Sequence, residues 1–422
     1  MPLSHNTKKH RLAMTGGMLA ISLFVLCLFA FGTTVYSSSL RGAAEESLHN
    51  ASVKSGNSSS SSSESTLELL HVIFRHGPRT PADTYPNDPH VDEKFFPFGW
   101  GQLTNNGKRE LFNVGSWLKK RYNNYLGPFY VPDYVHAQTT GVTRTMMSMQ
   151  LVLASLFPPK NTPMEWNSKY NWQPIPYTSQ PLEEDNLLLV RTPCPRYYEA
   201  LKEVFQLPEV KAQIEPYENL FKELTELTGM NVTTPEDVQS IYTTLLAESE
   251  FGLTLPDWTK KYYPEEMQYL AEQSYIYSVY TPEMQKIKAG PFLKKMFREM
   301  KQKQASELSP KDRKLFIYTG HDTSLVNILS ALGVWERQLP RYSIMALFEL
   351  HKNKKTGEYH VEIFMRNNPK ADAKPLTIPG CDRKCPLDKL IELTKNVVPT
   401  EESLSLCSAK DSSFTEPPPS GP

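Results

Sequence analysis

Residues 67–81 read LELLHVIFRHGPRTP, and this stretch decides the fold. It begins with a run of apolar residues at 69–74, broken only by His71, which is typical of a buried strand in a parallel sheet. The run ends at Gly77-Pro78, where the chain is expected to leave the strand. Because open α/β sheets bind ligands at the carboxyl ends of their strands, the residues just after this strand are candidates for a functional site.

Three side chains suited to binding and attacking an anion follow this strand. Arg75, His76 and Arg79 lie within five residues of one another. Guanidinium groups match phosphate oxygens in pairs, and a neutral imidazole can attack phosphorus. A basic turn on the surface is the simpler explanation for any one of these residues. The complete pattern at the end of a strand favours an anion site that contains a nucleophile.

A second turn of the same kind lies far along the chain. The apolar run at 314–319 predicts another buried strand, and it is followed by His321 and Asp322 and then by a predicted helix over 323–332. In a parallel sheet both turns open at the same edge, so we expect His76 to lie near His321 and Asp322. Asp322 also suits the cap of the following helix, and the two roles are compatible.

The remaining pattern predicts an α/β fold in which a mostly parallel central sheet is flanked by helices, with a smaller, mostly helical cap subdomain. Residues 160–290 mix Pro-rich loops with amphipathic segments and are assigned to that cap. Helices are expected at 104–121, 142–156 and 292–307, and further strands at 134–138, 345–351 and 359–366.

Arg144 lies in the first turn of the helix predicted over 142–156. The helix dipole disfavours a cation at that end. The position becomes reasonable if an anion binds at the same helix end. Arg144 is therefore a further candidate for contacting phosphate.

The chain begins with polar residues 1–11, and the uncharged residues 12–36 follow. This apolar segment is either a cleaved signal peptide or an uncleaved signal anchor that keeps the amino end in the cytoplasm. The Ser-rich residues 37–65 predict a flexible stalk. Either alternative places a domain at 66–407 in the lumen or outside the cell, in a secreted or a single-pass type II membrane protein. Residues 408–422 are predicted to form a disordered tail.

Lys plus Arg and Asp plus Glu each total 46, so the net charge is zero. This balance argues against nucleic acid as the main partner, and any positive field for a substrate must be local. Asn50, Asn57 and Asn231 each begin an Asn-x-Ser/Thr triplet and are candidates for glycosylation.

Four cysteines lie beyond the apolar leader, in which Cys27 is found. An even number in an exported domain indicates two disulfides, and four cysteines allow three pairings. Zinc is the rival explanation, but one Cys-x₃-Cys pair with two distant cysteines has poor spacing for a zinc site. The four residues are Cys194, Cys381, Cys385 and Cys407.

The segment RHGPRTP at 75–81 resembles the RHGxRxP signature of the histidine acid phosphatases, a branch of the histidine phosphatase superfamily. Other segments are similar to prostatic, lysosomal and insect venom-type members of the family. These are WGQLTNNG at 100–107, FPP at 157–159, WQPIP at 172–176 and CPR at 194–196. The resemblance covers about residues 67–407.

The resemblance implies an acid phosphatase that hydrolyses small phosphate monoesters through a phosphohistidine, without a cofactor or a metal ion. It assigns His76 as the nucleophile and Asp322 as the proton donor. It also implies a homodimer and the disulfides Cys194–Cys407 and Cys381–Cys385. The residues expected to hold the phosphate are Arg75, Arg79, Arg144 and His321.

The neighbouring cations should lower the pKa of His76 and keep it neutral, and they should also favour the ionised form of Asp322. One departure concerns Arg144, because acidic residues precede this arginine in many relatives, whereas TTGVT precedes it here. Two alternative functions remain. A phytase-like or lipid-phosphate phosphatase on the same fold would need a more basic pocket than residues 82–96 indicate, and a non-catalytic phosphate-binding secreted protein would not need His76 and Asp322.

Overall fold

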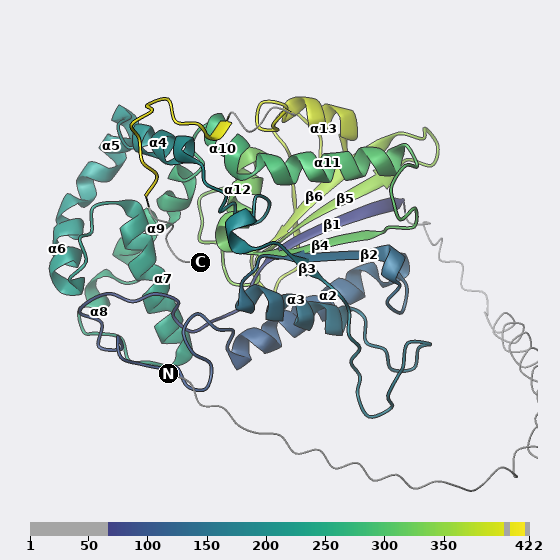
Figure 1. Ribbon diagram of the computed structural model, residues 1–422, viewed down its shortest axis with the longest axis horizontal. Coiled ribbons are helices and arrows are strands. Elements are labelled where there is room, and N and C mark those ends of the chain that lie inside the picture. Colours follow the sequence, from purple (N-terminus) through teal and green to yellow (C-terminus); the bar gives the residue numbers. More distant parts are fainter. Residues whose placement is uncertain (1–65, 401–405, 418–422) are drawn as a thin grey trace, which may run out of the picture. The chain divides into compact units, whose positions relative to one another are not determined.

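The structure of the protein is a computed structural model that describes residues 66–400 and 406–417. A central sheet is covered by helices on both faces, and a group of helices lies beyond one end of the sheet (Figure 1). The expectations for residues 1–11, 12–36 and 37–65, and those for Asn50 and Asn57, lie outside the described residues.

Within the described residues, eight strands form one mixed sheet in the order β3-β2-β4-β1-β5-β6-β7, and β8 pairs with β6. The strands from β3 to β1 are parallel, and β5, β6, β7 and β8 are added by antiparallel pairing. The predicted fold class is therefore confirmed for the core of the sheet. The strands are β1 (Leu67–Arg75), β2 (Val135–Thr139), β3 (Thr178–Ser179), β4 (Leu315–Gly320), β5 (Met345–Lys352), β6 (Tyr359–Arg366), β7 (Lys374–Leu376) and β8 (Cys385–Pro386).

Helices on the two faces of the sheet enclose separate apolar cores (Figure 1). One face packs on α2 (Asn105–Leu126) and α3 (Thr143–Leu156), and the other on α11 (Gly290–Gln304), α12 (Asp322–Ala331) and α13 (Leu387–Leu393). The group beyond the end of the sheet has its own two apolar clusters. It contains α4 (Pro195–Val204), α5 (Pro208–Ile214), α6 (Glu218–Thr228), α7 (Pro235–Phe251), α8 (Thr259–Tyr262), α9 (Glu265–Tyr277) and α10 (Pro282–Lys288). Short 3₁₀ turns lie at Pro132–Tyr134, Leu182–Glu184 and Glu215–Tyr217.

Strand β1 is buried on both faces, which explains its nearly continuous apolar sequence. Successive side chains of a strand point to opposite faces. Leu70, Val72 and Phe74 accordingly join the core under α2 and α3, whereas Leu69 and Ile73 join the core under α11 and α12. The central strand thus holds both layers together and fixes the position of the loop that follows it.

Helix α2 begins where the sequence predicts but ends later. The Thr104 hydroxyl accepts a hydrogen bond from the Gly107 amide at 3.1 Å and caps the helix. The expected end at residue 121 is wrong, because Tyr122 and Leu126 continue the buried face beyond the basic residues there. The helix ends at Gly127, whose φ of 86° suits glycine.

The chain around Cys407, where the sequence predicts the start of a disordered tail, is joined to helix α4. A disulfide joins Cys407 to Cys194 at the start of α4, and a second joins Cys381 to Cys385. The backbone amides of Lys410 and Asp411 donate to the Glu199 carboxylate at 2.8 and 2.9 Å. The covalent link therefore lies close to residues 408–417, which contact α4, and the disorder expected for residues 408–422 stays a prediction.

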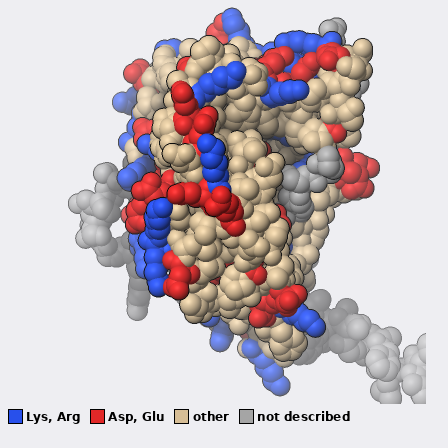
Figure 2. Space-filling view, turned by 90° about the vertical axis from the view of Figure 1, so that its left-hand side faces the viewer, with Lys and Arg blue, Asp and Glu red and all other residues tan. Residues whose placement is uncertain are grey.

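The surface on the side of the helical group carries acidic and basic side chains interspersed, without one continuous basic area (Figure 2). Asn231 is exposed, so a glycan on it would not disturb the core. No helix within residues 66–400 and 406–417 is long and apolar enough to cross a membrane.

Candidate active site

His76 follows the last residue of β1 and is held in one orientation. Its Nδ1 lies 2.9 Å from the carbonyl oxygen of Gly77, which can only accept a hydrogen bond. Nδ1 therefore carries the proton, and Nε2 keeps its lone pair. The residue is only 2% exposed, so this nitrogen faces the interior of the site.

The loop after His76 lies against helix α2 so closely that only glycine fits at two positions. A Cβ atom on Gly77 would lie 2.2 Å from Leu111, and one on Gly107 would lie 2.1 Å from the carbonyl oxygen of Pro78. Both distances are far below van der Waals contact. The glycines of the two sequence motifs thus allow the loop after His76 to lie against the first turn of α2.

The arginine side chains that the sequence predicts gather around His76. The Nε atoms of Arg75, Arg79 and Arg144 are buried, and none has a hydrogen-bond partner in the described part of the chain. Buried donors are normally paired because an unpaired donor costs free energy. Three unpaired guanidinium donors beside one imidazole are therefore suited to a ligand rich in oxygen, such as phosphate.

Burial and the charge of these arginines keep His76 neutral. Burial lowers the pKa of His76 well below its ordinary value, and the charges of Arg144 and Arg75 lower it further. The predicted direction is confirmed, with burial as the larger cause. Burial and the nearby charge of Arg79 also lower the pKa of Arg144 to about 9, so Arg144 is still a cation at acid pH.

The parallel pairing of β1 with β4 brings the second turn beside the first. Arg75 pairs with Gly320 in the register, and the His76 amide donates to the Gly320 carbonyl at 3.2 Å. The His76 and His321 rings are 5.5 Å apart between centroids. Arg144 donates to Nδ1 of His321 at 3.3 Å, so Nε2 of His321 carries the proton and faces the Thr140 hydroxyl at 3.1 Å.

Asp322 is the first residue of α12 and is held by three donors. Its Oδ2 lies 2.8 Å from an Arg75 nitrogen and 3.1 Å from the Tyr275 hydroxyl, and its Oδ1 accepts from the Thr323 amide at 2.8 Å. Burial raises the pKa of Asp322, but the charges of Arg75 and His321 and the hydrogen bonds from Thr323 and Tyr275 together outweigh it, and the pKa lies below its ordinary value. The cap position that the sequence offered to Asp322 belongs instead to His321.

Comparison with known proteins agrees with this geometry. The family model of the histidine phosphatase superfamily, branch 2, matches residues 66–366. The chain belongs to this family. The venom acid phosphatase Acph-1 of Apis mellifera is 37% identical over 345 residues, which cover 81% of this chain and 88% of that protein. The prostatic acid phosphatase of Homo sapiens is 34% identical over 355 residues, covering 83% and 90%.

Solved structures with the same fold include bacterial phytases. The apo form of the Hafnia alvei phytase superposes with a TM-score of 0.61 at 18% identity, covering 82% of this chain and 99% of that one. The phytase of Citrobacter braakii gives a TM-score of 0.61 at 15% identity, covering 82% and 100%. At this low sequence identity, the structural similarity indicates a shared fold and nothing more. The sequence relatives confirm both the recognised family and the predicted enzyme class, an acid phosphatase.

A cleft of about 520 Å³ opens on the histidine phosphatase site. Arg75, Tyr275 and Tyr342 form its inner wall, and the Tyr342 ring lies 4.4 Å from the Arg75 guanidinium and 5.7 Å from the His76 ring. This volume is within the usual range of small-molecule sites. Three acidic side chains also line the cleft, namely Glu110, Glu250 and Glu272.

Sequence reasoning missed three residues of the site. Thr140 follows the end of β2 at the same sheet edge, so the rule that identified His76 and His321 could have found it. Tyr275 lies inside helix α9 and Tyr342 in the segment before β5, where no local pattern marks them. Their place in the site depends on how the helical group meets the sheet.

Proposed function

We propose that the protein hydrolyses phosphate monoesters in two in-line displacements through a phosphohistidine on Nε2 of His76. The observation that carries this proposal is the hydrogen bond from Nδ1 of His76 to Gly77, because it leaves Nε2 as the only nitrogen with a lone pair. The unpaired guanidinium donors beside it supply the positive charge that phosphoryl transfer requires.

In the first step the lone pair of Nε2 attacks phosphorus while the bond to the leaving oxygen breaks and Asp322 gives that oxygen its proton. In the second step water attacks the phosphohistidine, Asp322 takes a proton from the water, and the nitrogen–phosphorus bond breaks to release phosphate. Arg75, Arg79 and Arg144 hold the three non-bridging oxygens throughout. Losing one such donor typically costs about 10²–10³ in rate.

The ion pair between Arg75 and Asp322 bears on the proton that the first step needs. Without a ligand, Arg75 favours the ionised carboxylate. A bound phosphate brings negative charge to Arg75 and next to Asp322, and a nearby like charge raises the pKa of a carboxyl group. Phosphate binding and acid pH therefore both favour the protonated form of Asp322 that donates.

The phytase-like alternative receives less support from the outer cleft. Glu110 and Glu250 form no ion pair in the described part of the chain, and Arg341 is the one other cation that lines this cleft besides Arg75. In their ionised form these carboxylates repel the further phosphates of an inositol polyphosphate, and protonation at acid pH, which burial favours by raising both pKa values, removes this repulsion without adding a cation. We therefore favour substrates with a single phosphate group.

We further propose that the domain is exported, with residues 12–36 acting as a signal peptide or as an anchor. Two disulfides support an oxidising compartment, and mass spectrometry of the mature amino terminus distinguishes cleavage from anchoring. The homodimer that the family resemblance implies stays a prediction.

The test of the proposed activity is phosphate release from p-nitrophenyl phosphate at pH 5. The wild type should turn over and His76→Ala should not. His360→Ala, on the distant strand β6, serves as a matched histidine control and should retain turnover. A wild type no more active than His76→Ala would favour the non-catalytic alternative.

A further inference from the structure

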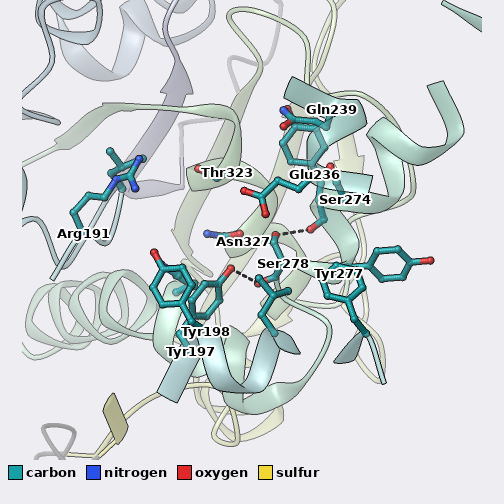
Figure 3. Close-up of a pocket in the computed structure, with 15 residues that line it drawn as sticks. Arg191, Tyr197, Tyr198, Glu236, Gln239, Ser274, Tyr277, Ser278, Thr323 and Asn327 are labelled. Carbon is teal, nitrogen blue, oxygen red and sulfur yellow. Dashed lines mark hydrogen bonds between the residues drawn. The ribbon is translucent and has the colours of Figure 1, made fainter. Parts of the chain in front are cut away.

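Tyr275 joins the proposed proton donor to the helical group. Its hydroxyl donates to Oδ2 of Asp322 at 3.1 Å. On the other side, Nε2 of Gln239 donates to the oxygen of the same hydroxyl at 2.8 Å. These groups lie in the wall of a cavity of about 170 Å³, where Figure 3 shows Gln239 and Thr323. A chain of hydrogen bonds therefore runs from α7 through α9 to the first residue of α12.

The hydrogen bonds of this chain have one direction. The pKa of Asp322 lies below its ordinary value, so the carboxylate has no proton to donate. Burial and the charge of Asp322 raise the pKa of Tyr275 well above its ordinary value, so the hydroxyl keeps its single proton. That proton goes to Asp322, and the hydroxyl oxygen can only accept from Gln239. Gln239 thus keeps the Tyr275 hydroxyl turned toward the carboxylate.

Charged and titratable groups of several elements surround Asp322. Arg75 at the end of β1, Arg144 in α3 and the neighbouring His321 each interact with its charge. The two arginines belong to the proposed phosphate clamp, and phosphate competes with Asp322 for Arg75. Tyr275 differs from these groups because its hydroxyl reaches Asp322 from the helical group. Phosphate therefore does not compete for the hydrogen bond that Tyr275 makes.

We propose that Tyr275 is a positioning residue for the phosphatase reaction, which holds one carboxylate oxygen of Asp322, and that Gln239 fixes the direction of this hydrogen bond. The inference rests on the proposed function, in which Asp322 gives a proton to the leaving oxygen. A hydrogen bond to the ionised form of an acid favours that form. Tyr275 therefore makes Asp322 a stronger acid and limits the pH range over which Asp322 is protonated.

The test measures single-turnover rates on ethyl phosphate as a function of pH, because a strongly basic leaving group depends most on the proton donor. In the wild type the rate should fall on the alkaline side as Asp322 loses its proton, and this alkaline limb should be absent from Asp322→Asn. Tyr275→Phe keeps the ring but not the hydroxyl, so the pKa of Asp322 should rise. The loss of a hydrogen bond to a charged group should move the limb to higher pH by about one unit.

Gln239→Met is the second variant, and it decides the matter if Tyr275→Phe does not fold. It removes the N–H group that holds the Tyr275 hydroxyl in one direction. Linked hydrogen bonds strengthen one another, so the bond from Tyr275 to Asp322 should weaken but not disappear. The alkaline limb should therefore move in the same direction as in Tyr275→Phe, by a smaller amount.

Tyr277→Phe is the matched control on the same helix. Nε2 of Gln273 donates to the Tyr277 hydroxyl at 3.3 Å, and the hydroxyl donates to Gln213 at 2.8 Å. Tyr277 lies apart from Gln239 in Figure 3. The control thus loses a buried tyrosine hydroxyl with a similar pair of partners, but one that does not contact Asp322. Its alkaline limb should stay at the wild-type pH.

The variants separate the possible results. A limb that stays in place in both Tyr275→Phe and Gln239→Met would overturn the inference while leaving the phosphatase function intact. An equal shift in Tyr277→Phe would assign the effect to the packing of α9 and would also overturn it. So would a limb that persists in Asp322→Asn, because another group would then cause it. If the wild type hydrolyses neither ethyl phosphate nor p-nitrophenyl phosphate, the proposed function itself fails.

Discussion

The Arg75 guanidinium lies 2.8 Å from the Asp322 carboxylate, although 247 positions separate the two residues in the sequence. Each residue adjoins a histidine of the site, and the pair therefore ties the end of β1 to the start of α12. Phosphate competes with Asp322 for Arg75, because both are anions that match a guanidinium. In the proposed mechanism, substrate binding thus acts on Asp322 through Arg75.

Asp322→Asn removes the proposed proton donor while keeping the shape of the side chain. A general acid contributes typically 10²–10⁴ in rate, and its help matters most when the leaving group is a strong base. We expect the variant to lose far more activity on alkyl phosphates than on p-nitrophenyl phosphate. Single-turnover rates for both substrates measure the difference. An equal loss on both would mean that Asp322 positions Arg75 rather than donating a proton.

Arg144→Met removes a cation that is buried near other cations. We expect kcat/KM to fall roughly 10²–10³ because a phosphate oxygen loses its donor. Arg144 lowers the pKa of His76, so its removal should raise that pKa and move the acid limb of the kcat/KM profile to higher pH. The folded protein holds the charge of Arg144 at a cost, since its pKa is lowered from its ordinary value to about 9.

The melting temperature of Arg144→Met should therefore be equal to or higher than that of the wild type. Thermal unfolding at pH 5 checks this, and Arg109→Met, on the exposed side of α2, is the control for losing an arginine. A large loss of stability together with an unshifted pH profile would assign Arg144 to packing.

The sequence is enough to predict which residues meet at the edge of the sheet. It is not enough to predict which residues of the helical group pack against that edge. His76 and Asp322 could be placed together because each follows a buried strand, and parallel strands present their carboxyl ends at one edge. Tyr275 could not be placed, because it lies in a helix of the second group and reaches Asp322 only through the packing of two layers.

The carboxyl-terminal segment at residues 408–417 shows a second limit of prediction from sequence. Ser- and Pro-rich composition predicts disorder when a segment has too little apolar surface to offset its ordering entropy. The Cys194–Cys407 disulfide removes part of that entropy, and Glu199 accepts the amides of Lys410 and Asp411. Composition does not report either contribution, because both depend on a partner more than 200 positions away.

Gly107→Ala tests the close approach between the catalytic loop and α2. The new methyl group would lie 2.1 Å from the Pro78 carbonyl oxygen, so the loop that carries His76 and Arg79 must move. Overpacking of this kind costs about 1–3 kcal/mol. We expect a lower melting temperature and a kcat reduced by at least tenfold, because the nucleophile is displaced. Asn105→Ala, an exposed position in the same turn, should change neither quantity. Full activity in Gly107→Ala would show that the loop is not held by this contact.

Glu248→Gln tests a buried carboxyl group outside the active site. Glu248 is fully buried, and neither carboxylate oxygen has a hydrogen-bond partner in the described part of the chain. Asp88, which is also buried, accepts hydrogen bonds from the His90 amide at 2.7 Å and from the Thr84 hydroxyl. Burial and the charge of Asp88 raise the pKa of Glu248 from 4.5 to about 8. The folded protein therefore favours the neutral, protonated form of Glu248.

Because the folded-state pKa of Glu248 lies above its unfolded value, folding takes up a proton between these two values. The stabilisation is complete below about pH 4.5 and is lost as the pH rises toward 8. Wild-type melting temperatures should therefore decline from pH 5 to pH 8, and the decline should be smaller in Glu248→Gln, which cannot ionise. Glu226→Gln, at an exposed position on α6, is the control for losing a glutamate and should follow the wild type more closely. If the melting temperatures of the wild type and Glu248→Gln fell by the same amount between pH 5 and pH 8, the ionisation of Glu248 would not destabilise the fold. Other groups would then cause the decline.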